Sequence, residues 1–561
     1  MKNDKIVIVG GVAAGTKAAA KLRRELPNAQ ITIITKEKNI SYAGCGLPYY
    51  IGGLIEERAT LIARTPEEFK NLLDIDVLTE HEAESVNWQK KVLSARNLQT
   101  KEVVEYPYDA LIVATGANPF GPPIEGMDLK NIFTLRTVED SDAIKEQVTS
   151  GKIKSVLVVG GGFIGLEVAE NLHHRGIKTT IIEMLEHILP GFDKEIALLA
   201  QKHICNKGVE VVTGEKVVEF KGNDKGAVVG AVTDKGREIK TDLVLWSIGV
   251  RPNVEFAKKC HVEMGSTGAI RVNRQMQTNI PAIYAVGDCA ECFHRITNNP
   301  VWIPMGSTAN KMGRVAAMNI SGNRDEMAGV LGTTIVQLFG MNIGRTGLST
   351  RVAREQGFDV ETVVVPLHDR AHYYPGAKLI TLKLVVARKT HRVLGAQAIG
   401  EGNIDKPIDI LVTLISLYGT VNDLTKMDFA YAPPFSPAMS VVITAANVML
   451  NKLGGKMIGT SAVECKERKD KGDEMQLVDV RPPEEFAAAH IEGSKNIPWG
   501  KLREKIGELD KKKETTIICK IGRSSYGASL TLHNEGFKDV KVLEGGMTVW
   551  PFDAEGEPAA K

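Results

Sequence analysis

Cysteine, aromatic residues and net charge are all scarce in this sequence. Its 561 residues include seven cysteines and 6% aromatic residues, and the formal net charge is +2. Seven scattered cysteines do not form the framework of a secreted disulfide-rich domain, so we expect reduced thiols and a cytoplasmic protein. A charge so close to balance creates no overall field that would attract nucleic acid. We therefore expect no nucleic-acid partner, and local basic sites stay open.

Long hydrophobic runs are also missing. The first five residues are polar and lead directly into a glycine loop, unlike a secretory signal peptide. The most apolar later stretch, residues 440–450, is interrupted by Thr444 and Asn447. It is shorter than the roughly 20 residues that span a bilayer. We expect a buried helix there and no membrane segment.

Glycine, in contrast, is abundant, with 54 residues, and two glycine-rich segments share one pattern. An apolar strand, a glycine turn, a helix and a second apolar strand follow one another from Lys5 and again from Ser155. Two such βαβ units predict two dinucleotide sites in a doubly wound α/β fold. A later strand at 379–386 and a helix at 404–417 indicate an α+β domain.

The second glycine turn fits G-x-G-x-x-G with Gly160, Gly162 and Gly165, between a strand ending at Val159 and a helix. Glycine permits close approach of a pyrophosphate, and the helix N-terminus offers unpaired N–H groups. Glu183 ends the next strand and suits a ribose 2′-hydroxyl. Since no arginine follows to hold a 2′-phosphate, NADH is favoured over NADPH.

The first glycine turn is less regular. It begins at Gly10 and ends at Gly15, but Val12 occupies the position of the middle glycine. The acid at the end of the following strand is displaced to Glu37. Two later apolar strands support a second cofactor site, because one ends in Thr115-Gly116 and the other in Gly287-Asp288.

These four motifs, in this order, resemble the two-dinucleotide-fold flavoprotein disulfide reductases over residues 1 to about 450. The resemblance implies FAD at the first turn and NADH at the second, with Asp288 on the ribityl chain and Glu167 toward the nicotinamide amide. The implied cofactor-binding residues are Gly10, Val12, Ala13, Gly15, Thr35, Lys36, Glu37, Ser41, Thr115, Gly116, Gly160, Gly162, Phe163, Ile164, Gly165, Glu167, Glu183, Gly249, Gly287 and Asp288.

Cys45 is the candidate redox cysteine. Many relatives carry Cys-x4-Cys beside the flavin, but this chain reads Ser-Tyr-Ala-Gly-Cys-Gly-Leu-Pro-Tyr-Tyr over 41–50 and has no second cysteine nearby. The segment resembles coenzyme A–disulfide reductases and NADH-dependent persulfide reductases, in which one cysteine forms a mixed disulfide or persulfide with the substrate. NADH oxidases and peroxidases use a similar cysteine through sulfenic acid. They carry a loop histidine where this chain has Ala13, which favours a sulfur substrate.

Three basic residues lie on one face of the helix after the first turn, namely Lys17, Lys21 and Arg24. They form either a solvated face or a phosphate site that resembles a coenzyme A site. Leu73 and Met439 stand where coenzyme A–disulfide reductases often have phosphate-binding lysines. Coenzyme A therefore stays open as a substrate or ligand, beside a smaller persulfide or polysulfide.

Segments 371–376 and 429–435 also resemble this family, which implies that Tyr373 and Tyr431 reach the cysteine of the partner subunit in a homodimer with shared active sites. Cys289 and Cys292 form a C-x-x-C directly after Gly287-Asp288. We interpret this pair as structural, at the start of a helix, and predict no metal site.

The C-terminal residues resemble a rhodanese domain, through Leu-Val-Asp-Val-Arg at 477–481 and Leu-Glu-Gly-Gly-Met at 543–547. Cys519 follows an apolar strand and precedes a helix, so loop N–H groups would cradle a bound persulfide. Arg523 comes four residues after Cys519, one earlier than rhodaneses often have it. We predict a sulfur-carrying Cys519, with a silent rhodanese as the alternative.

The predicted protein is thus a flavoenzyme with a fused sulfur carrier, although a sulfur carrier or redox sensor reset by its reductase half is the alternative from another class. The expected domains are FAD-binding at 1–150 and 246–328, NADH-binding at 151–245, dimerisation at 329–450, a charge-dense connector at 451–474 and a rhodanese-like domain at 475–561.

Overall fold

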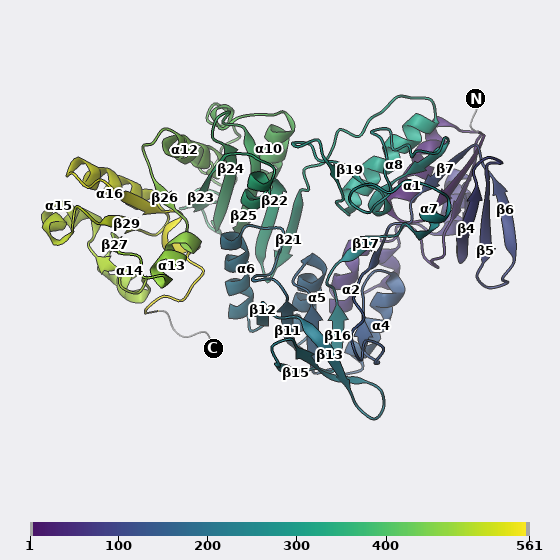
Figure 1. The fold of residues 1–561 in the computed structure, drawn as a ribbon, viewed down its shortest axis with the longest axis horizontal. Coiled ribbons are helices and arrows are strands. Elements are labelled where there is room, and N and C mark those ends of the chain that lie inside the picture. The colour runs from purple at the N-terminus through teal and green to yellow at the C-terminus, as the bar shows by residue number, and fades with distance from the viewer. Residues whose placement is uncertain (1–3, 557–561) are drawn as a thin grey trace. The chain divides into compact units, whose positions relative to one another are not determined.

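The computed structural model describes residues 4–556 and divides into two compact units (Figure 1). The first unit comprises Met1–Ile182 and Glu215–Val330, and the second comprises Glu183–Gly214 and Leu331–Lys561. Each unit has its own sheets and hydrophobic core. Among residues 4–556, no helix is both long and apolar enough to cross a membrane.

The sheet of the first βαβ unit has five parallel strands in the order β18-β7-β1-β2-β3. Its central strands are apolar because both faces are covered, and helices α1 (Ala13–Glu25) and α8 (Gly306–Ile320) pack against each other in the same core. The strands are β1 (Lys5–Val9), β2 (Gln30–Ile34), β3 (Asp76–Leu78), β7 (Ala110–Val113) and β18 (Ile283–Ala285).

The second βαβ unit forms parallel pairs in the order β11-β10-β16-β9. Helix α5 begins directly after its glycine turn, and the short helix α2 packs against α5 and α4. The elements are β9 (Ile132–Phe133), β10 (Ser155–Val159), β11 (Lys178–Glu183), β16 (Leu243–Trp246), α2 (Leu47–Gly52), α4 (Val138–Thr149) and α5 (Phe163–His174).

Smaller elements complete the first unit. They are the antiparallel sheet β4 (His81–Asn87), β5 (Val92–Asn97) and β6 (Val103–Pro107), the sheet β13 (Val217–Gly222), β14 (Val228–Thr233) and β15 (Glu238–Lys240), the pair β8 (Ala117–Pro119) and β17 (Val250–Pro252), the pair β19 (Cys292–Phe293) and β20 (Pro300–Val301), and helices α3 (Pro66–Leu73) and α7 (Glu255–Lys259).

An antiparallel sheet in the order β21-β22-β25-β24-β23 is the centre of the second unit. Helix α10 packs on β22 and β25, and α12 packs on β23 and β24. The elements are β21 (Thr334–Leu338), β22 (Met341–Gly347), β23 (Val360–His368), β24 (Leu379–Ala387), β25 (Val393–Gly400), α9 (Thr350–Glu355), α10 (Asp405–Ser416), α11 (Val421–Leu424) and α12 (Val441–Leu453).

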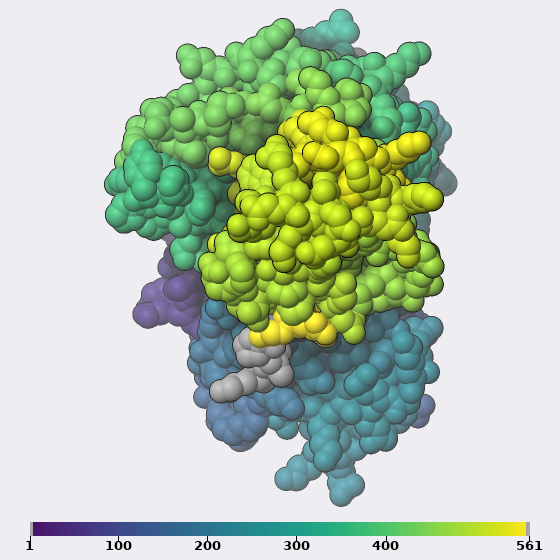
Figure 2. Space-filling model, turned by 90° about the vertical axis from the view of Figure 1, so that its left-hand side faces the viewer, coloured from purple at the N-terminus to yellow at the C-terminus, as the bar shows by residue number. Residues whose placement is uncertain are grey.

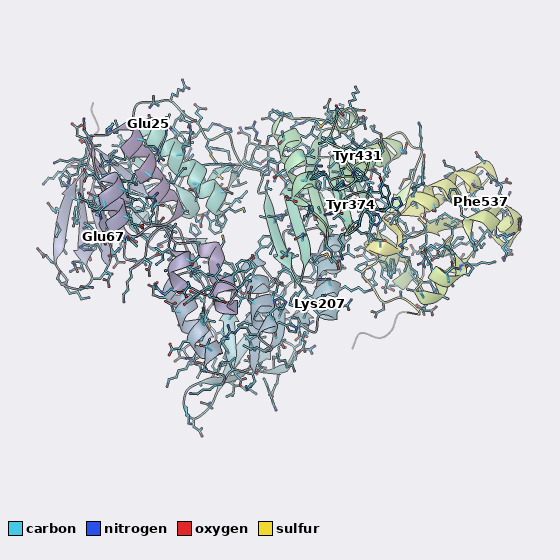
Figure 3. All side chains as sticks on the ribbon, turned by 180° about the vertical axis from the view of Figure 1, so that it is seen from behind. Glu25, Glu67, Lys207, Tyr374, Tyr431 and Phe537 are labelled. Atoms are coloured by element: carbon cyan, nitrogen blue, oxygen red, sulfur yellow. The ribbon has the colours of Figure 1, made fainter. Side chains whose placement is uncertain are left out.

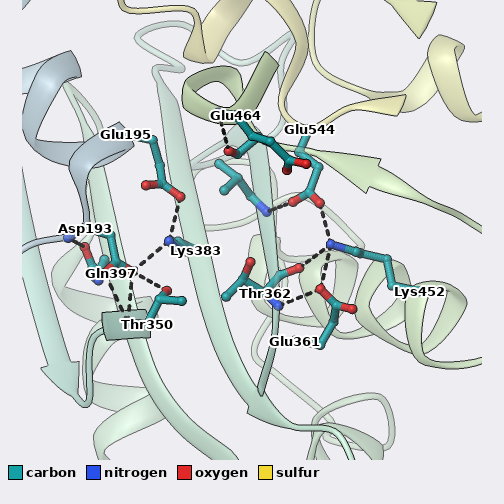
Figure 4. Close-up of polar contacts among 12 residues, drawn as sticks. Asp193, Glu195, Thr350, Glu361, Thr362, Lys383, Gln397, Lys452, Glu464 and Glu544 are labelled. Atoms are coloured by element: carbon teal, nitrogen blue, oxygen red, sulfur yellow. Dashed lines mark hydrogen bonds and ion pairs between the residues drawn. The ribbon is translucent and has the colours of Figure 1, made fainter. Parts of the chain in front are cut away.

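Residues 183–214, with α6 (Lys194–Asn206) and β12 (Glu210–Thr213), belong to this second unit. A buried ion cluster holds them there (Figure 4). Lys383 of β24 pairs with Asp193 at 2.7 Å and with Glu195 at 2.6 Å. The Asp193 carboxylate also accepts hydrogen bonds from the backbone N–H and the hydroxyl of Thr350.

The C-terminal domain is a parallel sheet in the order β26-β30-β29-β27-β28 with helices around it, and Figure 2 shows it as a rounded lobe in yellow-green and yellow. Its strands are buried between two apolar clusters. The elements are β26 (Gly459–Thr460), β27 (Met475–Asp479), β28 (Lys495–Asn496), β29 (Glu514–Ile518), β30 (Val540–Leu543), α13 (Ala462–Asp470), α14 (Pro483–Ala488), α15 (Leu502–Lys505) and α16 (Arg523–Asn534).

Two local expectations differ from the structure. The expected connector 451–474 contains the end of α12, β26 and α13, and Cys465 of α13 is buried in a core cluster. Its charged residues are exposed or partly buried, and Ser461 caps the helix by accepting the N–H of Glu464. Cys289 does not begin a helix, because a short 3-10 turn at Gly287–Cys289 leads into β19.

Candidate functional site

The first glycine turn joins β1 to α1. Gly10 has φ 119°, and a Cβ there would lie 2.1 Å from the carbonyl oxygen of Ala114, so a larger residue would clash. A Cβ on Gly15 would lie 2.0 Å from the carbonyl oxygen of Gly10. Val12 precedes Ala13, the first residue of α1, and gives it no side-chain cap. The turn keeps the geometry of the fingerprint despite Val12, and the N–H groups at the helix start suit a phosphate.

The segment after β2 returns to this turn. The N–H of Ser41 donates to the carbonyl of Gly11 at 2.8 Å. The Glu37 carboxylate accepts a hydrogen bond from the Tyr42 hydroxyl at 3.1 Å and pairs with Arg136 at 3.3 Å. The other predicted residues of this segment are Thr35, which is buried, and Lys36, which is exposed.

Asp288 lies after β18 with a carboxylate that no described residue contacts through a hydrogen bond. Burial raises the pKa of this carboxyl group, while Arg136 lowers it. A carboxylate that is withdrawn from water and has an open acceptor suits a ligand hydroxyl. The structure therefore fits the expected contact with a ribityl chain.

Two neighbours of the flavin loops were not predicted from sequence. Asn253 accepts the Thr115 hydroxyl on its carbonyl at 2.6 Å and donates its N–H to the Gly116 carbonyl at 2.8 Å. The Trp302 indole donates to the backbone carbonyl of Asp288 at 2.7 Å. Both residues line a pocket of about 540 Å³. The Arg-Pro-Asn run at 251–253 was the only sequence signal for Asn253.

The second glycine turn has an open side. A Cβ on Gly160 would lie 2.5 Å from the carbonyl oxygen of Ser247, and one on Gly165 would lie 2.3 Å from that of Gly160. Gly162 and Gly249 have nothing within 4 Å of a built Cβ. This is the cradle that a pyrophosphate needs. The remaining predicted residues are Phe163, which starts α5, Ile164, which is exposed, and Glu183, which ends β11 and accepts the N–H of Leu185 at 2.9 Å.

Cys45 lies in a short 3-10 turn, Gly44–Gly46, and its side chain is exposed. Helix α2 starts two residues later and packs on α5, which carries Glu167. Although the side chain reaches solvent, the surrounding protein atoms displace part of the hydration of its sulfur. This desolvation, followed by the carboxylates of Glu167 and Asp288, raises the pKa of the Cys45 thiol. The structure thus brings together three residues that were predicted separately, and it disfavours the free thiolate.

Tyr49 belongs with Cys45 and Glu167 in the structure, although the sequence indicated it only as part of the 41–50 motif. Its hydroxyl donates to Oε1 of Glu167 at 3.2 Å. Burial and the Glu167 carboxylate raise the pKa of Tyr49 to about 12, so the hydroxyl keeps its proton near neutral pH. Tyr49 therefore fixes the Glu167 carboxylate of α5 against α2, the helix that follows Cys45.

Tyr373 and Tyr431 meet in the second unit although 57 residues separate them in the chain. The N–H of Ala371 donates to the carbonyl of Pro433 at 3.2 Å, so the two segments lie side by side, and Figure 3 labels Tyr374 and Tyr431 there. A hydrogen bond with Tyr431 and its charge raise the pKa of Tyr373. Both phenols are exposed, at 66% and 53%, which leaves them accessible to a partner.

Cys519 differs from Cys45 in almost every respect. It follows β29, is 3% exposed, and its sulfur accepts the N–H groups of Gly522 at 3.2 Å and of Ser525 at 3.3 Å. Gly522 has φ 91° and precedes α16. Arg523 is exposed at the first position of that helix. These donors and the helix N-terminus can hold an anionic sulfur.

The basic face of α1 is reduced by pairing. Lys21 forms an ion pair with Glu25. Lys17 and Arg24 have no ion pair with any residue in the part of the chain that the structure describes. Leu73, at the end of α3, and the exposed Met439 have apolar side chains, so neither supplies a cation. Two of the three predicted phosphate contacts remain free to bind an anion.

Comparisons with known proteins agree with this geometry. Residues 4–313 match the family model of the pyridine nucleotide-disulphide oxidoreductases, residues 333–442 match the dimerisation domain of that family, and residues 461–551 match the rhodanese-like domain. A relative from Pyrococcus furiosus, the NAD(P)H sulfur oxidoreductase (CoA-dependent), is 38% identical over 450 residues, covering 80% of this chain and 100% of the relative.

Two solved structures also include the C-terminal domain. The NAD-dependent persulfide reductase from A. fulgidus is 40% identical, with a TM-score of 0.92 over 97% of this chain and 100% of its own. The reduced Bacillus anthracis CoADR-RHD is 35% identical, with a TM-score of 0.92 over 98% of each chain. The chain is therefore a member of the pyridine nucleotide-disulphide oxidoreductase family that carries a C-terminal rhodanese-like domain.

Proposed function

We propose that this enzyme uses NADH to reduce a low-molecular-weight persulfide or polysulfide and releases sulfide, with Cys45 as the reacting thiol and Cys519 as the carrier of sulfane sulfur. The observation that carries this proposal is the presence of two contrasting thiols in one chain. Cys45 is single and open, whereas Cys519 is buried in a cradle of N–H donors. The relatives named for persulfide and sulfur reduction support the same substrate class.

FAD and NADH fit the residues that would hold them. The turn at Gly10, the Glu37 segment, Thr115-Gly116 and Asp288 would bind FAD, and the turn at Gly160 with Glu167 and Glu183 would bind NADH. FAD supplies the two-electron link between NADH and sulfur. The open backbone at Gly162 and the unpartnered carboxylate of Asp288 are the structural support for this assignment.

The chemistry of the chain itself begins at Cys45. Its thiolate attacks the sulfane sulfur of R–S–SH, the S–S bond breaks, and RS⁻ leaves while a Cys45 persulfide forms. Two electrons then break the S–S bond of the Cys45 persulfide, release HS⁻ and restore the Cys45 thiolate. Desolvation, followed by the carboxylates of Glu167 and Asp288, raises the pKa of Cys45, so the thiol is the resting form and loses its proton before the attack. In the proposed homodimer, Tyr373 and Tyr431 of the partner subunit would donate protons to the leaving thiolates.

The dimer is part of the proposal. Residues 1–150 and 246–328 would form the FAD-binding domain, 151–245 the NADH-binding domain, and 329–450 the dimerisation domain of a homodimer with shared active sites. The exposed pair Tyr373 and Tyr431 supports this arrangement. All seven cysteines are free, which supports a reducing, cytoplasmic setting.

Coenzyme A–disulfide reduction is the second candidate. Lys17 and Arg24 support it, because two unpaired cations on one helix face suit the phosphates of coenzyme A. The loss of Lys21 to Glu25 and the apolar Leu73 and Met439 count against it.

Anaerobic NADH oxidation separates these functions. The wild type, Cys45→Ser and Cys519→Ser are each given coenzyme A disulfide, a thiol persulfide and polysulfide. We expect persulfide turnover that Cys45→Ser abolishes, and loss of sulfur transfer to cyanide in Cys519→Ser alone. Full persulfide turnover in Cys45→Ser would refute the central role of this thiol. Rapid use of oxygen or peroxide without any response to sulfur compounds would favour an oxidase or peroxidase, and sulfur transfer without NADH turnover would favour a carrier or sensor.

A further inference from the structure

A buried lysine in the second unit joins the C-terminal domain to the dimerisation sheet (Figure 4). Lys452 of α12 has a side chain that is 8% exposed, and its ammonium contacts three acceptors. These are the Glu544 carboxylate, the Glu361 carboxylate at 2.9 Å and the Thr362 carbonyl at 2.7 Å. An ammonium has three protons, so all its donors are used.

Glu544 completes the contact from the other side. One of its carboxylate oxygens faces Lys452 and the other accepts the N–H of Val364 at 3.0 Å. Val364 lies on β23, which is the edge strand of its sheet. An edge strand presents unpaired N–H and C=O groups. Lys452 and Glu544 together satisfy two such groups, the carbonyl of Thr362 and the N–H of Val364, as a neighbouring strand would.

The fit around Glu544 is close. Its N–H donates to the carbonyl of Thr460 at 3.0 Å, and a Cβ on Gly459 would lie 2.1 Å from its Oε1. The residue is 4% exposed although it carries a carboxylate. A buried ion pair adds little to stability compared with apolar packing. The three contacts of Lys452 and the two of Glu544 instead define how these segments meet.

Glu544 leads directly into the backbone that supports Cys519. Gly545 and Gly546 follow with φ of 71° and 59°. The next N–H, that of Met547, donates to the carbonyl of Cys519 at 2.8 Å. A Cβ on Gly546 would lie 2.1 Å from that same carbonyl oxygen. The 543–547 turn therefore rests on the Cys519 loop at one end and on β23 at the other.

We propose that Glu544 is a positioning residue for Cys519. Its carboxylate, bound by Lys452 and by the edge of β23, holds the Gly545-Gly546 turn that supports the Cys519 loop. The same contact joins the C-terminal domain to β23 and α12. The expected change in the rate of sulfur transfer rests on the proposed function of Cys519. The position of the Cys519 loop can be tested without that function, through the alkylation rate of Cys519.

The test uses the full-length, FAD-loaded protein with Glu544→Gln, Glu544→Gln/Lys452→Met and Glu508→Gln as the control. The Glu508 carboxylate pairs with the half-exposed Lys495 at 2.7 Å in the same domain. Three quantities are measured: kcat for sulfur transfer from a thiol persulfide to cyanide, the alkylation rate of Cys519 by iodoacetamide, and the melting temperature.

We expect Glu544→Gln to lower kcat for transfer by about tenfold or more and to raise the alkylation rate of Cys519 by a similar factor, since a small displacement of a reacting group has effects of this size. The control should change neither. In Glu544→Gln the buried ammonium of Lys452 loses one of its two carboxylates. The double variant removes that ammonium, and Glu361 keeps its ion pair with Arg388 at 2.8 Å, so the melting temperature should return toward that of the wild type. Its transfer rate should stay low, which a purely stabilising role would not predict.

Recovery of both transfer and alkylation protection in the double variant would overturn the inference, as would wild-type values in Glu544→Gln. If the wild-type protein transfers no sulfur through Cys519, the proposed function fails. The alkylation rates then decide alone whether Glu544 holds the loop.

Discussion

Cys45 and Cys519 are two thiols of one chain that differ in exposure and in the groups around the sulfur. Cys45 is exposed between two glycines, and desolvation by the surrounding protein, followed by two nearby carboxylates, raises its pKa. Cys519 is buried, and two N–H groups point at its sulfur. In the proposed function, the first environment gives substrates of different shape access to a thiol that is regenerated by reduction. The second protects a persulfide from water and from other thiols.

The largest expected effect concerns the thiol that turns over. Cys45→Ser should lower NADH-dependent reduction of persulfide by about a thousandfold or more, as loss of a nucleophile does in other enzymes. Cys205→Ser, which changes another free and partly exposed thiol, is the control and should keep its activity. Stopped-flow measurement of NADH oxidation under nitrogen checks this. Equal loss in the control would mean that the effect is one of folding.

Glycine substitutions near the two cysteines should differ in their effect on stability, with the larger loss near the buried Cys519. Gly546→Ala places a methyl group against the Cys519 carbonyl at a left-handed φ, so we expect a loss of about 1–3 kcal/mol in stability and strong loss of sulfur transfer. Gly44→Ala has nothing within 4 Å of the new methyl group and should change stability by less than about 0.5 kcal/mol. Thermal unfolding and cyanide-dependent transfer measure both. Equal tolerance at the two sites would remove the structural contrast.

Substrates with and without phosphate groups test whether the basic face of α1 helps to bind the substrate of Cys45. Lys17→Ala/Arg24→Ala should raise KM for coenzyme A disulfide by about tenfold, because its phosphates lose their contacts with the two cations. KM for inorganic polysulfide should stay unchanged, because polysulfide has no phosphate. Lys21→Ala is the matched control on the same helix, since its ammonium is already paired with Glu25. An equal effect of Lys21→Ala would point to the helix face as a whole, and no effect of either would remove coenzyme A from this site.

The smallest effect concerns the pKa of Cys45. Desolvation of the sulfur is the main cause of the raised pKa, and the Glu167 carboxylate raises the pKa further. Glu167→Gln removes that charge and lowers the pKa, so a larger fraction of thiolate is present at any pH below it. We expect alkylation of Cys45 near neutral pH to become a few times faster. The pH profile of iodoacetamide labelling measures this, and a profile that moves to higher pH would contradict the assignment.

Local patterns in the sequence predicted most of the fold. The turns at Gly10 and Gly160, with their flanking strands, lie where apolar runs and glycines placed them, because strand, turn and helix are set by neighbouring residues. The helix α13 was taken for a connector, since its charged residues hide that Ala462 and Cys465 are buried. The burial of these two residues depends on strands that are distant in sequence.

The site was predictable to a similar depth. Cys45, Glu167 and Asp288 were named from motifs, and the structure brings them within electrostatic reach of one another. Asn253, Trp302 and Glu544 were missed, because their partners are 14 to 180 residues away. A charged residue such as Glu544 reads as surface in a sequence. Only the opposing Lys452 and the edge of β23 make its burial acceptable.

The ion cluster at Lys383 has a practical consequence for anyone who divides this protein into fragments. Lys383 is buried, and its counter-ions Asp193 and Glu195 come from a segment that begins some 150 residues before the sheet. A fragment that starts at residue 331 would lack both carboxylates that pair with this ammonium and also helix α6, which packs on β22 and β25. The smallest sound expression unit for the sheet and the rhodanese-like domain therefore includes residues 183–214, supplied through a linker or as a co-expressed peptide.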